Sequence, residues 1–227
     1  MLRSPRRVAH DEPNTMNSAA HIAAVTLLLV ALSARAETPP AAAHEAQMLA
    51  KRALACLQRG EDATDPDQKR AAYEKGLALA ERAVKLDDDN ADAHFAVFGN
   101  RGRILLLDGT VPNPVSLLSV NRDLERALEI NPNHAAALAA KGGLYRQLPW
   151  ALGGSLSVAE ECLTKAIDLD PNAVSARIEL AATYRDMGQP QRSRPLLETA
   201  AHIAEAEGKA RQLREAEGLL KELPPPE

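Results

Sequence analysis

Apolar side chains recur three or four positions apart along most of the chain beyond residue 41, and short polar segments separate these runs. Such spacing places the apolar side chains on one face of an α-helix. The pattern predicts an all-α protein with four antiparallel helix hairpins and a closing helix. The expected helices cover residues 42–59, 67–86, 91–108, 114–130, 134–147, 157–169, 173–187, 190–206 and 208–222.

Residues that favour helix ends support several of these boundaries. Asp65, Pro66 and Gln68 offer an N-cap, a first helical proline and a glutamine in the first turn, and Asn113 and Pro114 repeat the first two features. Pro195 would lie beyond the first turn of the helix over residues 190–206, which predicts either a later start or a kink. Three glycines follow apolar runs and are expected to end helices in the left-handed conformation: Gly60, Gly109 and Gly188.

The chain contains an internal repeat. The segments ERAVKLDDDNADAHF from Glu81, ERALEINPNHAAAL from Glu125 and TKAIDLDPNAVSAR from Thr164 each have the pattern of a helix, a stop and a second helix. Their shared alanine, continued by a fourth, recurs at spacings of 44, 39 and 34 residues at Ala83, Ala127, Ala166 and Ala200. Extra residues in one loop of each earlier repeat would explain the longer spacings, and stacked repeats of this kind form a solenoid.

The last unit, PNAVSARIELAATYRDMGQPQRSRPLLETA, resembles the tetratricopeptide repeat (TPR) family, whose period is about 34 residues. Its large, small, aromatic, turn-glycine and small positions are occupied by Leu180, Ala181, Tyr184, Gly188 and Ala200. Pro132 and Pro171 match the proline that ends a repeat, whereas Lys141 stands where a core leucine is usual. The resemblance covers about residues 42–206. It implies a right-handed solenoid of helix hairpins, of the exported bacterial type, with a concave groove that binds a protein or peptide.

The segment LPWALGGS, residues 148–155, forms the enlarged turn of the third hairpin. It lacks the pattern of a phosphate-binding loop, in which a lysine and then a serine or threonine follow the second glycine of G-x-x-x-x-G, so its glycines are expected to supply a left-handed conformation or a close approach. Ser157 and Glu160 then fit a capping box at the start of the next helix. Trp150 is expected either to fold back over its own hairpin or to anchor a partner. The segment is also similar to the TPR component of tripartite (TRAP-type) transport systems, which associates with a solute-binding partner.

Composition and spacing leave no recognisable enzyme chemistry. A formal net charge of −4 without a concentrated basic face excludes a typical nucleic-acid-binding protein. The histidines form neither a His-Glu-x-x-His motif nor a pair at helical spacing, and no nucleophile–base pair is identifiable. A disulfide between Cys56 and Cys162 is chemically allowed in an exported protein, but buried thiols fit their positions in different hairpins better. We therefore expect a non-enzymatic protein without a metal or cofactor.

The N-terminal region predicts a Sec-type signal peptide. Residues 22–32 form an apolar stretch that is too short to span a bilayer, and Ala34 and Ala36 form an A-x-A cleavage site. Translation could begin at Met1 or Met16. Cleavage after Ala36 would remove four arginines and two acidic residues and change the formal charge from −4 to −6. Glu37 would then stand where a lipoprotein needs a cysteine, so we expect neither a lipid anchor nor stable membrane insertion.

The predicted organisation is a leader over residues 1–36, a helical-repeat domain over residues 37–223 and a proline-rich tail over residues 224–227, in a periplasmic or secreted protein. The first helices of such a solenoid line the concave face. The TPR resemblance places there one arginine per hairpin, which could grip a partner's carboxylate or could be an ordinary solvated charge. The candidate partner-binding residues are Arg103, Arg146, Arg185, Phe95 and Trp150.

The resulting hypothesis is an exported TPR scaffold or adaptor that binds a protein or peptide in its concave groove. One alternative is a structural component that assembles into a homo-oligomer, because alanine-rich solenoids with an apolar terminal stripe can stack. Another is an accessory protein of solute transport with a small-ligand pocket near Trp150.

Overall fold

The computed structural model describes residues 39–109 and 114–224. The predicted signal peptide with its cleavage site, Asn113 and most of the predicted tail lie outside the described residues. The chain divides into residues 1–38 and a unit of residues 39–227, and the helices described below belong to the second unit.

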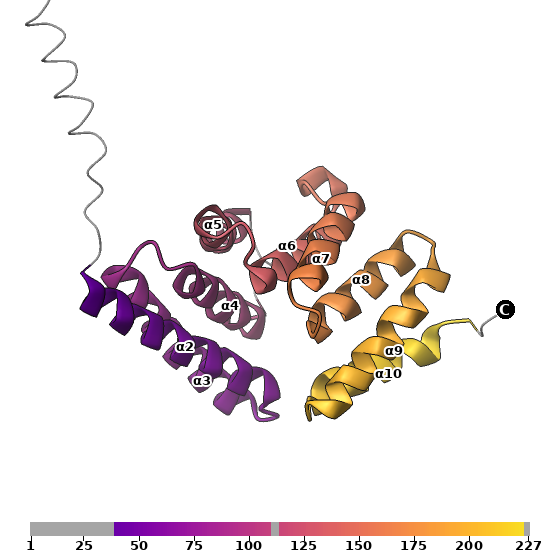
Figure 1. Ribbon diagram of the computed structural model, residues 1–227, viewed down its shortest axis with the longest axis horizontal. Helices are drawn as coiled ribbons and strands as arrows, with labels where there is room; N and C mark the ends of the chain where they lie inside the picture. Colours follow the sequence, from indigo (N-terminus) through magenta and orange to yellow (C-terminus); the bar gives the residue numbers. More distant parts are fainter. Residues whose placement is uncertain (1–38, 110–113, 225–227) are drawn as a thin grey trace, which may run out of the picture. The chain divides into compact units, whose positions relative to one another are not determined.

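Within the described residues the regular secondary structure is entirely helical (Figure 1). The helices form four hairpins, α2 with α3, α4 with α5, α6 with α7 and α8 with α9, and α10 packs on the last hairpin. The prediction of an all-α hairpin array with a closing helix is therefore confirmed. The elements are α2 (Pro40–Asp62), α3 (Pro66–Leu86), α4 (Ala91–Leu107), α5 (Pro114–Ile130), α6 (Ala135–Gln147), the 3-10 turn η1 (Trp150–Leu152), α7 (Leu156–Leu169), α8 (Val174–Asp186), α9 (Pro190–Ala206) and α10 (Ala210–Glu222).

The repeated alanines lie in the core of successive hairpins. All four are completely buried, and each occupies the second helix of its hairpin, at Ala83, Ala127, Ala166 and Ala200. A methyl side chain allows helix backbones to approach closely, and larger neighbours such as Leu163 and Leu197 fill the space around it. Burial of such side chains drives the stacking of one hairpin on the next.

The helix ends follow the sequence signals at most positions. The Asp65 carboxylate accepts hydrogen bonds from the backbone N–H groups of Asp67 and Gln68, at 2.8 and 3.0 Å. Gly109 and Gly188 adopt positive φ angles of 62° and 73°, as predicted. Gly60 does not end its helix, because α2 continues to Asp62.

Gly60 instead allows α2 and α3 to pack closely. A Cβ atom at this position would lie 2.3 Å from the Tyr73 ring, so the glycine makes room for that aromatic side chain. Pro195 had left the start of α9 open between two possibilities. This helix begins at Pro190 and continues through Pro195, so the later start considered from the sequence is wrong.

Candidate functional site

The three candidate arginines each pair with a carboxylate on a neighbouring first helix or on α10. Arg103 of α4 donates to Glu61 of α2. Arg146 of α6 donates to Glu179 and Asp186 of α8, each at 3.0 Å. The Nη1 atom of Arg185 of α8 lies 2.9 Å from Glu222 of α10. The arginines thus tie adjacent layers of the repeat array together.

The three arginines differ in exposure. The side chains of Arg103 and Arg185 are 45% and 42% exposed, as expected for solvated charges. Arg146 is not a solvated charge, because only 19% of its side chain is exposed. Burial opposes its protonation, but the nearby charges of Glu179 and Asp186 and the hydrogen bonds to them raise its pKa above the ordinary value.

Phe95 packs at the junction between the second and third hairpins. Its ring stacks on Phe98 with centroids 6.1 Å apart and lies 5.1 Å from the ring of His134. The pair packs against a buried cluster that contains Leu124 and Ala137. Phe95 is therefore partly covered by its own fold, which reduces the area that it can offer to a partner.

A chain of polar side chains joins α2, α4 and α6 beside this aromatic pair. Gln47 donates to Asp92 at 2.9 Å, and the amide of Asn90 donates back to Gln47 at 3.0 Å. His134 contacts Asp92 through Nε2 at 3.0 Å while its Nδ1 accepts from the backbone N–H of Ala137. The hydrogen bond from His134 lowers the pKa of Asp92, and the bond from Gln47 adds to this against the effect of burial.

Gln47, Asn90 and Asp92 border an open hollow of about 340 Å³ at the start of α4. His134, the N-cap of α6, is largely covered. Only 10% of its side chain is exposed, and the carboxylate that it contacts belongs to Asp92, 42 residues earlier in the chain.

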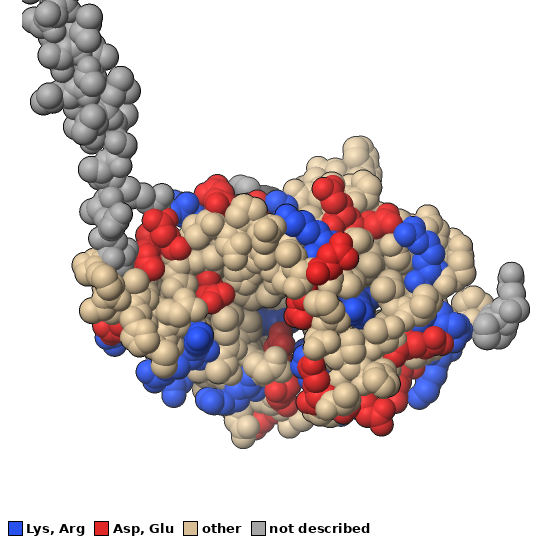
Figure 2. All heavy atoms as spheres, in the orientation of Figure 1, with Lys and Arg blue, Asp and Glu red and all other residues tan. Residues whose placement is uncertain are grey.

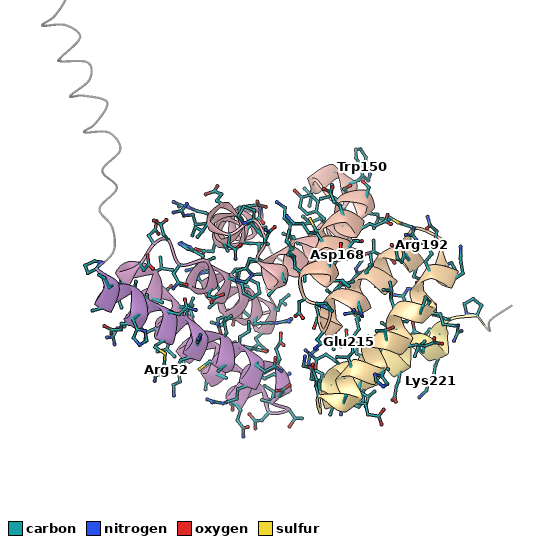
Figure 3. All side chains as sticks on the ribbon, in the orientation of Figure 1. Arg52, Trp150, Asp168, Arg192, Glu215 and Lys221 are labelled. Carbon is teal, nitrogen blue, oxygen red and sulfur yellow. The ribbon has the colours of Figure 1, made fainter. Side chains whose placement is uncertain are left out.

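Trp150 and Leu152 project from the turn between α6 and α7, where Figure 3 shows the Trp150 side chain pointing away from the helices. They are 87% and 59% exposed. The expectation that Trp150 folds back over its own hairpin is therefore wrong. Both side chains belong to the short helix η1, none of whose residues is buried.

The backbone of this turn is held in place at several points. Gly153 adopts a left-handed φ of 90°, and a Cβ atom on Gly154 would lie 1.8 Å from the carbonyl oxygen of Leu148. The N–H of Ser155 then donates to the carbonyl of Tyr145 at 3.0 Å. The interpretation of the paired glycines as packing and conformational residues is thus supported by geometry.

The start of α7 differs in detail from the predicted capping box. Ser155, rather than Ser157, is the N-cap and accepts from the N–H of Val158 at 3.4 Å. Glu160 does not turn back to the helix start. Its carboxylate accepts from Tyr184 and from Arg192, whose guanidinium lies 3.7 Å from the centroid of the Tyr184 ring. Glu160, which the local pattern predicted to cap the helix, therefore contacts residues of α8 and α9 instead.

Arg192 and Asp168, labelled in Figure 3, line a mostly apolar hollow of about 400 Å³ beside α7, α8 and α9. Trp150 lines neither this hollow nor the one beside Asp92. Figure 2 shows acidic and basic side chains interspersed on the visible face.

Among residues 39–109 and 114–224, no group of three or more His, Cys, Asp or Glu side chains could hold a metal ion. Cys56 and Cys162 are free thiols, and burial raises the pKa of Cys162.

No helix in the described part of the chain is both long and apolar enough to cross a bilayer.

Comparisons with known proteins relate this geometry to a family. The model of the family described as "Regulator of microtubule dynamics protein 1-3" matches residues 9–150, a range that includes the first two hairpins, α6 and Trp150. A comparison with curated proteins gave no match.

Solved structures share the fold at low sequence identity. PilF of Pseudomonas aeruginosa aligns with a TM-score of 0.50 and 17% identity over 82% of this chain and 80% of that one. TTC0263, a TPR protein of Thermus thermophilus, gives a TM-score of 0.45 at 17% identity over 75% of this chain and 91% of that one. YrrB, a TPR protein with an unusual peptide-binding site, gives 0.33 at 19% identity over 59% and 78%. The likeness to PilF agrees with the fold of repeated helix hairpins described above.

Proposed function

The chain belongs to the regulator of microtubule dynamics protein 1-3 family, and we propose that it is a non-enzymatic scaffold that binds a protein partner. The binding surface consists of the turn over residues 148–155 and the adjoining surface of α6 and α8. Trp150 is its anchor, and the small side chains of α6 and α8 allow a partner segment to approach.

The exposure of Trp150 on a fixed turn is the observation that carries this proposal. At 87% exposure it is the most exposed of the large apolar side chains in the described residues, and Leu152 lies two positions away. Aromatic anchors dominate the binding energy of many protein interfaces. A turn already held by Gly154 and the Ser155 backbone loses little further freedom on binding, which favours affinity.

We further propose that the partner is periplasmic or secreted, because the apolar stretch and the Ala34–Ala36 site have the pattern of an exported protein. The description of the family names microtubule dynamics, which makes polymerised tubulin a second candidate partner. Co-sedimentation of the chain with microtubules tests that candidate directly. A chain that stays in the supernatant at micromolar tubulin would remove it.

Capture of a partner by native chain and by variants tests the anchor. Trp150→Ala should lose the captured protein, whereas Leu106→Ala should retain it, because Leu106 is 61% exposed but belongs to α4. The purified partner should also change the emission of Trp150, the only tryptophan of the chain. Equal capture by both variants, or unchanged emission on saturation, would contradict the assignment.

Self-assembly is the alternative that the same turn permits, since an exposed Trp–Leu pair can bury itself against a second copy. Sedimentation at micromolar concentration separates the two functions. The scaffold proposal expects a monomer. An oligomer that dissociates in Trp150→Ala would instead assign the turn to assembly.

A further inference from the structure

Glu61 joins two arginines that come from different parts of the fold, Arg103 of α4 and Arg211 of α10. It lies in the last turn of α2. Its Oε1 atom accepts from Arg103 of α4, and its Oε2 atom lies 3.2 Å from Nη2 of Arg211 of α10, which is 150 residues away in the sequence. Figure 1 shows the end of α2 beside the start of α10.

This contact is polar and small. In the part of the chain that the structure describes, no other hydrogen bond or ion pair joins α10 to α2. The apolar face of α10, with Leu213, Ala216 and Leu220, packs on the last hairpin instead. Loss of the Glu61 carboxylate would therefore release α10 from α2 without exposing a hydrophobic core.

The arginines retain binding capacity beyond what Glu61 uses. The buried Nε atom of Arg211 has no hydrogen-bond partner, and its contact with Glu215 is long, at 3.4 Å. The side chains of Arg103 and Arg211 are 45% and 35% exposed, compared with 17% for Glu61 between them. A guanidinium binds a carboxylate best through two parallel hydrogen bonds, whereas Glu61 offers one oxygen to each.

We propose that Arg103 and Arg211 form a binding site for the carboxylates of an acidic partner segment, and that Glu61 occupies this site as an internal competitor. The inference rests on the scaffold function proposed above and adds the chemical class of the partner to it. A partner with two or more neighbouring acidic side chains displaces Glu61, gains bidentate contacts with the arginines and releases α10 from α2. Only molecules in which Glu61 has left the arginines can bind the partner. The apparent affinity for the partner is therefore lower than the intrinsic affinity, in proportion to the fraction of such molecules.

Glu61→Gln is the informative variant because glutamine keeps the size of the side chain and removes the competing charge. Glu215→Gln is the matched control, since Glu215 also contacts Arg211 but lies on α10 itself and does not join it to α2. The probe is an acetylated hexaglutamate peptide, titrated by calorimetry at low ionic strength. A hexaglutamine peptide controls for contacts that are independent of charge.

We expect Glu61→Gln to bind hexaglutamate about three- to tenfold more tightly than the native chain, the range for removing a partly exposed competing ion pair. Glu215→Gln should stay within about twofold of native. Adding Arg211→Gln to Glu61→Gln should abolish the gain. Unfolding curves of each variant establish that the fold is retained.

Two results would overturn the proposal. One is an affinity of Glu61→Gln no higher than that of the native chain. The other is an equal gain in Glu215→Gln, because a general change in net charge would then explain both. Loss of partner capture in Trp150→Ala does not depend on either result, so the scaffold function and the acidic-segment site can fail separately.

Discussion

The imidazole of His94 contacts the carboxylate of Asp123, with Nδ1 lying 3.3 Å from Oδ1, and this pair joins the two helices of the second hairpin. The opposite ring nitrogen faces the carbonyl and the carboxylate of Asp88, at 3.1 and 3.3 Å. Asp123 also accepts from Arg101 at 2.6 Å. Burial lowers the pKa of His94, but the hydrogen bonds and charges of the two aspartates outweigh burial and raise it above the usual value.

The first prediction follows from the sign of this shift. Because the folded state binds the proton more tightly, His94 contributes stability that is fully present below its unfolded pKa of about 6.5 and is lost as pH rises through the folded pKa. Urea unfolding at pH 5.5 and pH 8 should therefore show a larger free-energy difference between native chain and His94→Gln at the lower pH. A difference between native and variant that does not change with pH would contradict this account.

The second prediction concerns the glycine turn. Gly154→Ala should destabilise the chain by about 1–3 kcal/mol, because its Cβ would overlap the backbone carbonyl of Leu148. Gly143→Ala is the control. Its Cβ would meet the Glu179 carboxylate at 3.5 Å, an ordinary contact, and alanine favours the interior of α6 by about 0.5–1 kcal/mol. Thermal unfolding should move the two variants in opposite directions.

The third prediction distinguishes the arginines by their burial. Arg146→Gln should cost about 1–3 kcal/mol, because two carboxylates lose a charged hydrogen-bond donor that is only 19% exposed. Arg185→Gln removes a more exposed pair, 42% and 63% accessible, and should cost less than about 1 kcal/mol. Equilibrium unfolding of the single variants measures both. Equal losses of unfolding free energy in the two variants would mean that burial does not determine how much each ion pair contributes to stability.

The same comparison changes how a triple arginine variant must be interpreted. Replacement of Arg103, Arg146 and Arg185 together would test these three candidate partner-binding residues at once. Their contacts predict a loss of stability as well, so reduced capture by the triple variant would not identify a binding site. Single variants, with unfolding measured beside capture, avoid this confusion.

The fourth prediction concerns Trp150 in the absence of a partner. Since the side chain is 87% exposed, Trp150→Ala should change the free energy of unfolding by no more than about 0.5 kcal/mol. The native chain should show tryptophan emission at long wavelength and efficient quenching by iodide. Emission at short wavelength with weak quenching would indicate that the ring is covered in solution.

The candidate site was only partly predictable. The sequence identified the arginines, Phe95 and Trp150 as residues to examine, but it could not supply their neighbours. The partners of Arg146 lie 33 and 40 residues away, and Arg211 meets Glu61 across 150 residues. Glu61 and Arg211 were missed because a single charge in a helix end gives no local signal of a distant counter-charge.

The sequence by itself determined the helices, their order and the buried alanines. Helix periodicity, caps and the recurrence of Ala83, Ala127, Ala166 and Ala200 depend on residues within a few turns of one another, so these signals survive without tertiary contacts. Only the tertiary structure decided that Gly60 packs on Tyr73, that His134 is covered and that Trp150 points outward. Those outcomes depend on how closely separate helices approach, and that distance is set by the packing of the whole array.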